Sequence, residues 1–522
     1  MSRGFISVLD STLRDGAQGE NISFSVSDKL QIVRALDEFG VDYIEAGNPS
    51  SNPKDTAFFT AASALSLQSA KLCAFGSTRR KGFTAEGDPH VAALLQAGTP
   101  AVTIFGKAWE LHIADILQVT PEENLAMIFD TIAFFKERGR EVIFDAEHFF
   151  DGYKDNPRYA LRVLEAAEKA GADILCLCDT NGGSLPTEVQ AITAAARAAA
   201  NAPIGIHTHN DSGCAAANSL VAVEAGAAHV QGTFTGFGER CGNGELSAIL
   251  PALALKSGYR ITGELARLSS TAGKIAEISN VQLSARKPYV GASAFSHKAG
   301  MHIDGMLKNS ASFEHIDPFE VGNQRKFLIS EMAGRQGVLE KIKHFAPGLT
   351  KDSPELALIV GRLKELEHFG YHFEAADASF ALMAKKVLGL FVPHFTLQVF
   401  KTTCDFPAGD GDYRSAATVT IAVDGVEETR AATGQGPVNA LDIALREALA
   451  VFYPGLAKMK LTDYKVRVLD EGRATASKVR VLIESTDALE TWSTIGVSAD
   501  IIEASLIALL DSIEYKLSKG GC

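Results

Sequence analysis

Two histidines stand one residue apart in the segment GIHTHND, directly after a short apolar run. If that run is a strand, His207 and His209 point to the same face and present two imidazoles side by side. Neighbouring imidazoles are a frequent arrangement of metal ligands, whereas two core histidines satisfied by their neighbours are the plainer alternative. The segment alone does not decide between these interpretations, so other potential ligands must be sought.

Two further potential ligands follow other apolar runs. Asp15 lies in DSTLRDGAQ, after the strand-like FISVLD, and Asn243 lies in the glycine-rich segment GTFTGFGERCGNGE. With the two histidines, Asp15 would complete a set of two imidazoles and one carboxylate, which suits a divalent metal with open coordination positions. Asn243 could add a weaker oxygen ligand. The alternative for both residues is an ordinary turn, in which Asp and Asn are common.

Four more residues at the ends of such runs could handle a substrate. Arg14 precedes Asp15, and Glu45, in IEAG, could pair with it. Thr180, in CDTNGG, could hold a carboxylate, and Glu147, in FDAEHF, could act as a base. The alternatives are a turn arginine, a structural glutamate and two plain residues at loop starts. Because all of these polar residues follow strand-like segments, a shared site explains them better than chance does.

The elements that must position these residues recur regularly through the first half of the chain. Eight short apolar segments begin at Phe5, Asp42, Lys71, Ala101, Glu141, Asp173, Pro203 and Ala228. Helical patterns separate them at intervals of roughly 25 to 40 residues, as the units of a (β/α)8 barrel require. We therefore predict an α/β TIM barrel over residues 1–265, with the polar residues at the carboxyl ends of its strands, where chemistry occurs in this fold.

After the predicted barrel, the alternation of strands and helices stops. Residues 266–390 show helical segments and loops, which predict a helical connector. Residues 391–522 predict a duplicated α+β module, because strand and helix patterns near Val419 recur near Val479. Gly436 and Gly496 each precede a predicted helix, whose free N–H groups could bind an effector carboxylate. The alternative is that these glycines only permit tight turns.

Composition restricts the classes of partner. The chain has 522 residues and a formal net charge of -13, which argues against nucleic acids or an anionic membrane as partners. No apolar run approaches the roughly 18 residues of a membrane span, and the N-terminal residues contain no signal-peptide core, so we expect a cytoplasmic protein. The seven cysteines include no CxxC pair, so neither a disulfide framework nor a zinc ribbon is indicated.

Three sequence motifs resemble those of a known family. DSTLRDGAQ, HTHND and GFGERCGN resemble the signatures of the α-isopropylmalate, homocitrate and citramalate synthases, a metal-dependent TIM-barrel family. The resemblance spans nearly the whole chain, including the connector and the C-terminal module. DAEHFFDGYK, CDTNGG and SFEHIDPFEVGN are most similar to the citramalate branch of that family.

The resemblance implies an acyltransferase that condenses acetyl-CoA with a 2-oxo acid. By that resemblance the 2-oxo acid is pyruvate, the products are (R)-citramalate and CoA, and the route leads to isoleucine. The alternatives are 2-isopropylmalate or homocitrate synthesis, a carbon–carbon lyase similar to hydroxymethylglutaryl-CoA lyase, and a non-catalytic amino-acid sensor. A set of two imidazoles and hard oxygen ligands favours Mg²⁺ or Mn²⁺, with Zn²⁺ as an alternative.

The resemblance also assigns roles to residues. It implies that Arg14, with Glu45 beside it, and Thr180 bind the substrate, and that Arg14, Glu147 and His302 are catalytic. It implies four metal ligands, namely Asp15, His207, His209 and Asn243. In relatives the histidine corresponding to His302 reaches the neighbouring subunit, which implies a homodimer, and the C-terminal domain implies an effector, isoleucine or leucine. Relatives carry a tyrosine where this chain has Phe313, so the role of that hydroxyl does not transfer.

Overall fold

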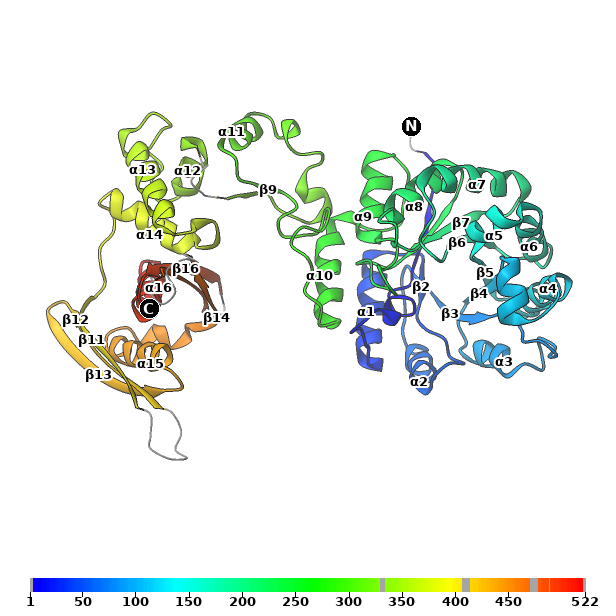
Figure 1. The fold of residues 1–522 in the computed structure, drawn as a ribbon, viewed down its shortest axis with the longest axis horizontal. Coiled ribbons are helices and arrows are strands. Elements are labelled where there is room, and N and C mark those ends of the chain that lie inside the picture. The colour runs from blue at the N-terminus through cyan, green and yellow to red at the C-terminus, as the bar shows by residue number, and fades with distance from the viewer. Residues whose placement is uncertain (1–2, 329–333, 406–413, 470–476, 488, 520–522) are drawn as a thin grey trace. The chain divides into compact units, whose positions relative to one another are not determined.

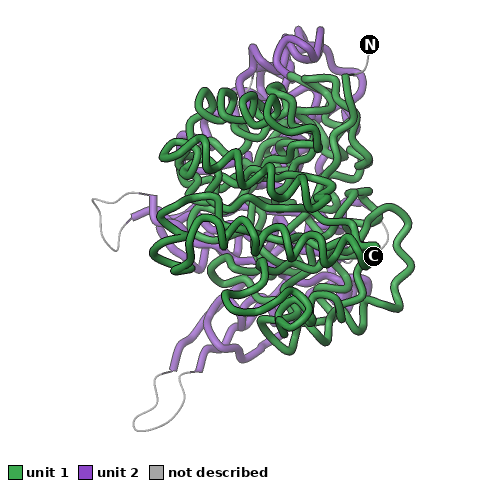
Figure 2. The backbone as a smooth tube through the Cα atoms, turned by 90° about the vertical axis from the view of Figure 1, so that its right-hand side faces the viewer, with its two compact units in different colours: residues 1–295, 315–325 green, residues 296–314, 326–522 purple. Residues whose placement is uncertain are grey.

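The computed structural model describes residues 3–328, 334–405, 414–469, 477–487 and 489–519. The chain forms two compact units, which Figure 2 distinguishes by colour. Residues 1–295 and 315–325 make up the first unit, and residues 296–314 and 326–522 make up the second. Within the described ranges, no helix combines the length and the apolar character that a membrane crossing needs.

The first unit contains a closed barrel of eight parallel strands in sequential order. The strands are β1 (Ser7–Asp10), β2 (Tyr43–Glu45), β3 (Lys71–Ser77), β4 (Ala101–Lys107), β5 (Glu141–Glu147), β6 (Ile174–Asp179), β7 (Ile204–Thr208) and β8 (His229–Gly232). Ser7 pairs with His229, so β1 and β8 close the barrel. This architecture confirms the predicted TIM barrel, and each strand begins within one of the eight predicted segments.

Helices surround the barrel (Figure 1). They are α1 (Val26–Phe39), α2 (Pro53–Ala62), α3 (Pro89–Gln96), α4 (Pro121–Glu137), α5 (Phe149–Asp155), α6 (Pro157–Lys169), α7 (Pro186–Ala199), α8 (Ala215–Glu224), α9 (Leu246–Pro251) and α10 (Leu268–Ile278). Several of them begin with a capping side chain followed by proline, as at Asn52, Asp88, Thr120 and Asn156. Such a side chain accepts a free N–H of the first turn, and proline at the first helical position lacks an N–H to satisfy.

Two apolar layers hold the barrel together. Inside it, residues such as Leu9, Ile143 and Cys176 form a small cluster of buried side chains. Outside it, a much larger cluster joins the outward side chains of the strands to the helices, with Phe39, Phe135 and Phe144 among its fully buried members. The strands are therefore buried on both faces, and the strand ends remain as the places where polar side chains can gather.

The second unit begins with short strands and helices. These are β9 (Ser296–His297), α11 (Gly300–Lys308), β10 (Lys326–Phe327), α12 (Arg335–Ile342), α13 (Pro354–Phe369) and α14 (Asp377–Val387). Apolar side chains from α12, α13 and α14 share one buried cluster, to which Leu363 and Phe380 belong. A mainly helical segment was predicted after the barrel, and this part of the second unit is mainly helical.

The C-terminal part consists of two modules of the same build. Strands β11 (Thr396–Asp405), β12 (Arg414–Val423) and β13 (Val426–Gly434) form one antiparallel sheet, followed by α15 (Pro437–Ala450). Strands β14 (Lys460–Val468), β15 (Val479–Thr486) and β16 (Thr491–Ser498) form the other, followed by α16 (Ile501–Leu517). The predicted duplication of strands followed by a helix is confirmed.

The predicted equivalence of Gly436 and Gly496 is wrong. Gly436 directly precedes α15, but Gly496 lies inside β16. A Cβ at Gly496 would collide with the carbonyl of Ala504, so this glycine permits the strand to pack closely on α16. The first turn of α16 is capped by the side chain of Asp500, which accepts hydrogen bonds from two backbone N–H groups. An effector carboxylate would meet that negative charge.

Candidate metal and substrate site

Three potential metal ligands converge at the carboxyl end of the barrel. Asp15 follows β1, His207 is part of β7, and His209 follows directly after β7. The Nε2 atoms of the two histidines lie 3.4 Å apart, and Oδ2 of Asp15 lies 3.6 Å from that of His207 and 3.9 Å from that of His209. All three residues are buried. The structure therefore brings together the predicted set of two imidazoles and one carboxylate.

The three ligand atoms lie slightly farther apart than a bound divalent cation would hold them. Ligand atoms about 2.1 Å from a cation lie roughly 3.0 to 3.5 Å apart when the coordination angles are about 90° to 110°. The 3.4 Å edge between the histidines fits this range, and the edges of 3.6 and 3.9 Å to Asp15 would shorten slightly on binding. Nδ1 of His207 lies 3.0 Å from Oε1 of Gln231, and because that oxygen only accepts, Nδ1 must carry the proton. The lone pair of His207 is then on Nε2, which faces Asp15 and His209. Such orientation of a ligand by a neighbour is typical of metal sites.

The surroundings of Asp15 and His209 favour the protonation states in which these residues bind a metal. Burial opposes ionisation of Asp15, but Arg14, His207 and His209 outweigh it and hold the pKa of Asp15 well below its usual range. Burial and, secondly, the charge of His207 lower the pKa of His209 to about 4. Metals bind ionised carboxylates and neutral imidazoles, so both shifts prepare the site for a cation.

Asn243, the fourth predicted ligand, lies behind Asp15. Its backbone pairs with that of His209, and its Nδ2 donates to Oδ1 of Asp15 at 2.8 Å. Its Oδ1 is buried and has no hydrogen-bond partner among the described residues. A side chain at Gly238 would collide with this amide, which explains a glycine there. In this arrangement Asn243 orients Asp15, and its role as a ligand stays a prediction.

Arg14 is held on both sides by carboxylates. Its Nε donates to Oε2 of Glu45 at 2.6 Å, and its Nη1 donates to Oδ2 of Asp15 at 2.8 Å. Burial opposes its charge, but Glu45 and Asp15 outweigh this effect and raise its pKa. Its guanidinium also lies 3.8 Å from the centre of the Phe75 ring. Arg14 is thus a fixed positive charge beside the potential ligands, and the predicted pairing with Glu45 is present.

Glu147 and Thr180 occupy the ends of neighbouring strands. Glu147, the last residue of β5, forms an ion pair with Lys107 at the end of β4. Thr180 follows β6, and its hydroxyl oxygen accepts the backbone N–H of His148 at 2.9 Å. Because that oxygen accepts from His148, its own hydrogen remains able to donate elsewhere. Thr180 can therefore offer a hydrogen bond to a substrate carboxylate.

One cavity of about 240 Å³ joins most of the predicted site residues. Its lining includes Arg14, Asp15, Glu147, Thr180, His207 and His209. Glu45 is fully buried beneath Arg14, and Asn243 lies behind Asp15. His302 belongs to the second unit, on α11, where its ring stacks on Phe313 at a centroid distance of 4.4 Å.

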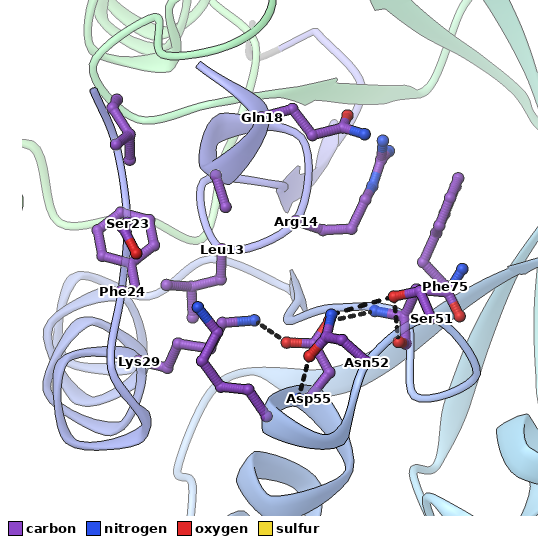
Figure 3. A pocket seen from close by; sticks show the side chains of 14 residues that line it. Leu13, Arg14, Gln18, Ser23, Phe24, Lys29, Ser51, Asn52, Asp55 and Phe75 are labelled. Carbon is purple, nitrogen blue, oxygen red and sulfur yellow. Dashed lines mark hydrogen bonds and ion pairs between the residues drawn. The ribbon is translucent and has the colours of Figure 1, made fainter. Parts of the chain in front are cut away.

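A second cavity of about 340 Å³ adjoins the first. Arg14, Gln18 and Phe75 line both cavities. Figure 3 shows these three side chains among those that line the second cavity. Its far wall contains a buried ion pair, in which Lys29 donates to Oδ1 of Asp55 at 2.6 Å and to the carbonyl of Ala46 at 2.8 Å. Lys29 therefore connects this wall of the cavity to the backbone that follows Glu45.

Several residues of the site carry no strong local signal in the sequence. Asp145 lines the first cavity and accepts a hydrogen bond from Gln231, which also holds His207. Burial and the charge of Glu45 raise the pKa of Asp145. Its position two residues before Glu147 places both on one face of β5, which was a usable signal. Gln231 lies inside β8, and nothing in its own segment indicates its partners.

Asp145, Cys176 and Cys178 form a second group of potential ligands. A thiol must lose its proton to bind a metal. Burial raises the pKa of Cys176 well above its usual value, which opposes that loss. The group of Asp15 and the two histidines is therefore the better candidate for a metal site.

Family models match three consecutive parts of the chain. A model described as HMGL-like matches residues 6–280. A model described as homocitrate synthase post-HMGL domain-like matches residues 289–370, and one described as LeuA allosteric (dimerisation) domain matches residues 374–517. The first match contains the barrel and all the potential ligands discussed above.

Curated relatives match along nearly the whole chain. An (R)-citramalate synthase of Aquifex aeolicus is 51% identical and covers 98% of both chains. The protein of that name from Synechocystis sp. is 49% identical over 97% of this chain and 95% of its own. A third, from Geobacter sulfurreducens, is 48% identical over 98% of both chains.

Proposed function

The chain belongs to the α-isopropylmalate, homocitrate and citramalate synthase family, in its (R)-citramalate synthase branch, and from this membership we propose that it condenses acetyl-CoA with pyruvate. The products are (R)-citramalate and CoA, on a route to isoleucine. The observation that carries the proposal is the cavity in which Arg14, Thr180 and the three potential ligands meet. These groups are suited to binding the ketone and the carboxylate of a 2-oxo acid.

A divalent cation would activate the 2-oxo acid for this reaction. Asp15, His207 and His209 would hold it, and a bound cation would polarise the ketone of the 2-oxo acid. Hard oxygen donors beside two imidazoles favour Mg²⁺ or Mn²⁺, with Zn²⁺ as the alternative. Asn243 keeps the carboxylate of Asp15 in place through its 2.8 Å hydrogen bond.

The side chains of the chain position the 2-oxo acid. Thr180 donates its free hydroxyl hydrogen to the carboxylate of the substrate. Arg14 places its fixed positive charge where negative charge develops on the ketone oxygen. Donors preorganised in this way stabilise a transition state strongly, because they need no rearrangement during the reaction.

Glu147 is the proposed base for the acetyl group. It accepts a proton from the methyl carbon of acetyl-CoA, and the resulting enolate attacks the ketone carbon of the 2-oxo acid. A positioned base contributes roughly 10² to 10⁴ to such a rate. His302 is the proposed partner that supplies a proton to the new alkoxide. Water then hydrolyses the thioester, which releases CoA and makes the overall reaction irreversible.

The second cavity is the proposed place for the rest of acetyl-CoA. It opens beside Arg14 and Gln18, which it shares with the first cavity, so a long substrate can extend from one into the other. Its lining combines apolar side chains such as Leu13 and Phe24 with amides such as Asn48. This mixture suits the pantetheine part of CoA, which carries amide groups on an apolar chain.

Two aromatic rings in the first cavity favour a small 2-oxo acid as the substrate. Phe75 and Phe105 line the first cavity and stack on each other at a centroid distance of 5.1 Å. We propose that the side chain of the 2-oxo acid lies against these rings, which leave room for the methyl group of pyruvate. A branched 2-oxo acid, which would make the chain a 2-isopropylmalate synthase, or the longer acid of a homocitrate synthase would need more room.

The same membership supports two further proposals. The match to a dimerisation domain supports a homodimer in which His302 completes the neighbouring active site. If citramalate is the product, isoleucine is the fitting effector of the C-terminal part, and leucine fits the isopropylmalate alternative. The position of Gly496 inside β16 removes one of the two predicted places for such an effector.

The proposal is tested by identifying the product. The metal-loaded chain is incubated with acetyl-CoA and pyruvate labelled at its methyl carbon, and the products are analysed by nuclear magnetic resonance and chiral chromatography. We expect (R)-2-methylmalate and one free thiol per molecule formed. A lyase would cleave carbon–carbon bonds and a sensor would form no product, so either outcome would contradict the proposal.

A further inference from the structure

His148 has an unusual backbone conformation directly after the proposed base Glu147. Its φ of 57° and ψ of 35° lie in the left-handed region, which is uncommon for residues other than glycine. The residue directly follows β5 and is the N-cap residue of the short helix α5. A strained residue at such a place needs contacts that hold it, and it often serves the site next to it.

The contacts that hold His148 come from its ring. Nδ1 lies 3.3 Å from Oδ2 of Asp151, and the side chain is 9% exposed. The ring of His112 lies 4.2 Å away between centroids, and that of Trp109 lies 5.8 Å away. Asp151 is itself fixed by Asn181, which donates to the same carboxylate oxygen at 2.9 Å. The imidazole is therefore enclosed by one carboxylate and two aromatic rings.

The conformation of His148 determines where its backbone N–H points. That N–H donates to the hydroxyl oxygen of Thr180 at 2.9 Å. One peptide therefore links the end of β5, with Glu147, to the end of β6, with Thr180. The hydrogen bond also fixes the rotation of the Thr180 side chain, so that its own hydrogen is directed away from His148.

We infer that His148 is a positioning residue, whose enclosed ring holds the backbone N–H that orients Thr180 toward the carboxylate of the 2-oxo acid. Glu147 acts on acetyl-CoA and Thr180 acts on the 2-oxo acid, so His148 keeps two groups that act on different substrates at a fixed spacing. The inference rests on the proposed function. His148 lies outside the predicted set of site residues, and the substrate whose binding depends on it is the 2-oxo acid.

A double-mutant cycle with Thr180 tests this role. The variants are His148→Ala, which removes the ring, Thr180→Val, which removes the hydroxyl, and the combination of both. His148→Asn is the conservative variant, because asparagine tolerates the left-handed conformation and its amide can approach Asp151. Asn280→Ala is the control for strain, because Asn280 also has a positive φ, of 53°, but lies after α10.

We expect His148→Ala and Thr180→Val each to raise KM for pyruvate about tenfold, which is typical of one lost hydrogen bond to a charged group. KM for acetyl-CoA should change little, and the double variant should resemble either single variant, because both remove the same interaction. His148→Asn should recover most of the loss, and Asn280→Ala should match the parent. Circular dichroism and thermal unfolding check that every variant is folded.

The outcomes separate the inference from the function on which it rests. If the parent chain turns over pyruvate but the two changes combine additively, or if KM for both substrates rises equally, only the role of His148 is contradicted. Unchanged kinetics of His148→Ala would also contradict only the role of His148. If the parent releases no thiol with any 2-oxo acid, both the proposed function and this inference are contradicted.

Discussion

At the residue scale, the chain holds its three potential metal ligands by different means. Asp15 is fixed by Arg14 and Asn243, and His207 is fixed by Gln231. Nδ1 of His209 is buried without a partner in the described part of the chain. A ligand that is fixed by a neighbour loses affinity when the neighbour is removed, even though the ligand itself remains.

The first prediction compares the loss of a potential metal ligand, His207, with the loss of Gln231, the residue that orients it. His207→Ala should abolish measurable binding of Mn²⁺, whereas Gln231→Leu should weaken it by roughly 10 to 100 fold, because the imidazole remains but loses its fixed orientation. Titration calorimetry with Mn²⁺ on the metal-free chain measures both effects. His368→Ala, at an exposed position of α13, is the control. Equal affinities for the parent and His207→Ala would mean that His207 does not bind the ion.

The second prediction concerns pH and His229. This residue is fully buried, and burial, followed by the charge of His207, lowers its pKa to about 3. In the unfolded chain its pKa is about 6.5, so below that pH the unfolded state takes up a proton that the folded state does not. The free energy of unfolding should therefore fall by up to about 1.4 kcal/mol per pH unit as pH drops below 6.5.

Urea unfolding at several pH values between 7 and 4.5 measures this dependence. His229→Gln can keep a hydrogen bond to Ser7, whose Oγ lies 2.8 Å from Nδ1 of His229, but it cannot titrate. The variant should therefore lose stability less steeply with falling pH than the parent does. Identical slopes for the two proteins would show that His229 is not kept neutral by the fold.

The types and spacing of residues were sufficient to indicate much of the site. His207 and His209 were recognisable because side chains two apart in a strand share a face, and Asp15 and Arg14 because they follow a strand. The residues that hold them were not recognisable. Gln231 and His148 act through hydrogen bonds between different strands, and such partners have no fixed spacing in the sequence.

At the scale of elements, residues near the ends of β3 and β4 form part of the wall of the first cavity. Phe75 and Phe105 stack there, and both face the cavity that contains Arg14. The third prediction is that Phe105→Ala raises kcat/KM for 2-oxoisovalerate relative to pyruvate by roughly tenfold or more, because space for added methyl groups changes discrimination by about that factor. Phe83→Ala, at an exposed ring outside the cavity, is the control.

Steady-state kinetics with both 2-oxo acids give the two ratios. A ratio that stays at the parent value in Phe105→Ala would mean that another part of the cavity selects the substrate. A similar change in Phe83→Ala would mean that the effect is indirect.

The elements themselves were predictable to different degrees. The eight barrel strands were recognisable because strands buried on both faces form continuous apolar runs between helices. The repeat in the C-terminal part was also recognisable, but the point at which each helix begins was not. The connection between β12 and β13 spans Asp424 and Gly425, whereas that between β15 and β16 spans residues 487–490, so equal spacing in the sequence does not mean equal position.

At the scale of the whole molecule, the proposed reaction needs residues from both units. Glu147 belongs to the first unit and His302 to the second. The fourth prediction is that mixed dimers of Glu147→Ala and His302→Ala recover activity, although each variant alone is inactive. Recovery follows because, if sites are built across the dimer, one of the two sites in a mixed dimer has both groups intact.

Co-expression with two different affinity tags and tandem purification provide the mixed dimer. About half of the parent activity per dimer is the expected upper limit, since only one of its two sites is complete. Mixed dimers of two preparations of Glu147→Ala are the control. Verified mixed dimers without activity would mean that each chain completes its own site.

The central claim is that the barrel site uses a divalent metal to condense acetyl-CoA with a small 2-oxo acid. The most direct test is the release of free thiol from acetyl-CoA with a panel of 2-oxo acids, before chelation, after chelation and after restoration of Mg²⁺ or Mn²⁺. We expect the highest kcat/KM with pyruvate, loss of activity on chelation and recovery with the metal. Full activity in excess chelator, preference for 2-oxoisovalerate, or no release with any 2-oxo acid would contradict the claim.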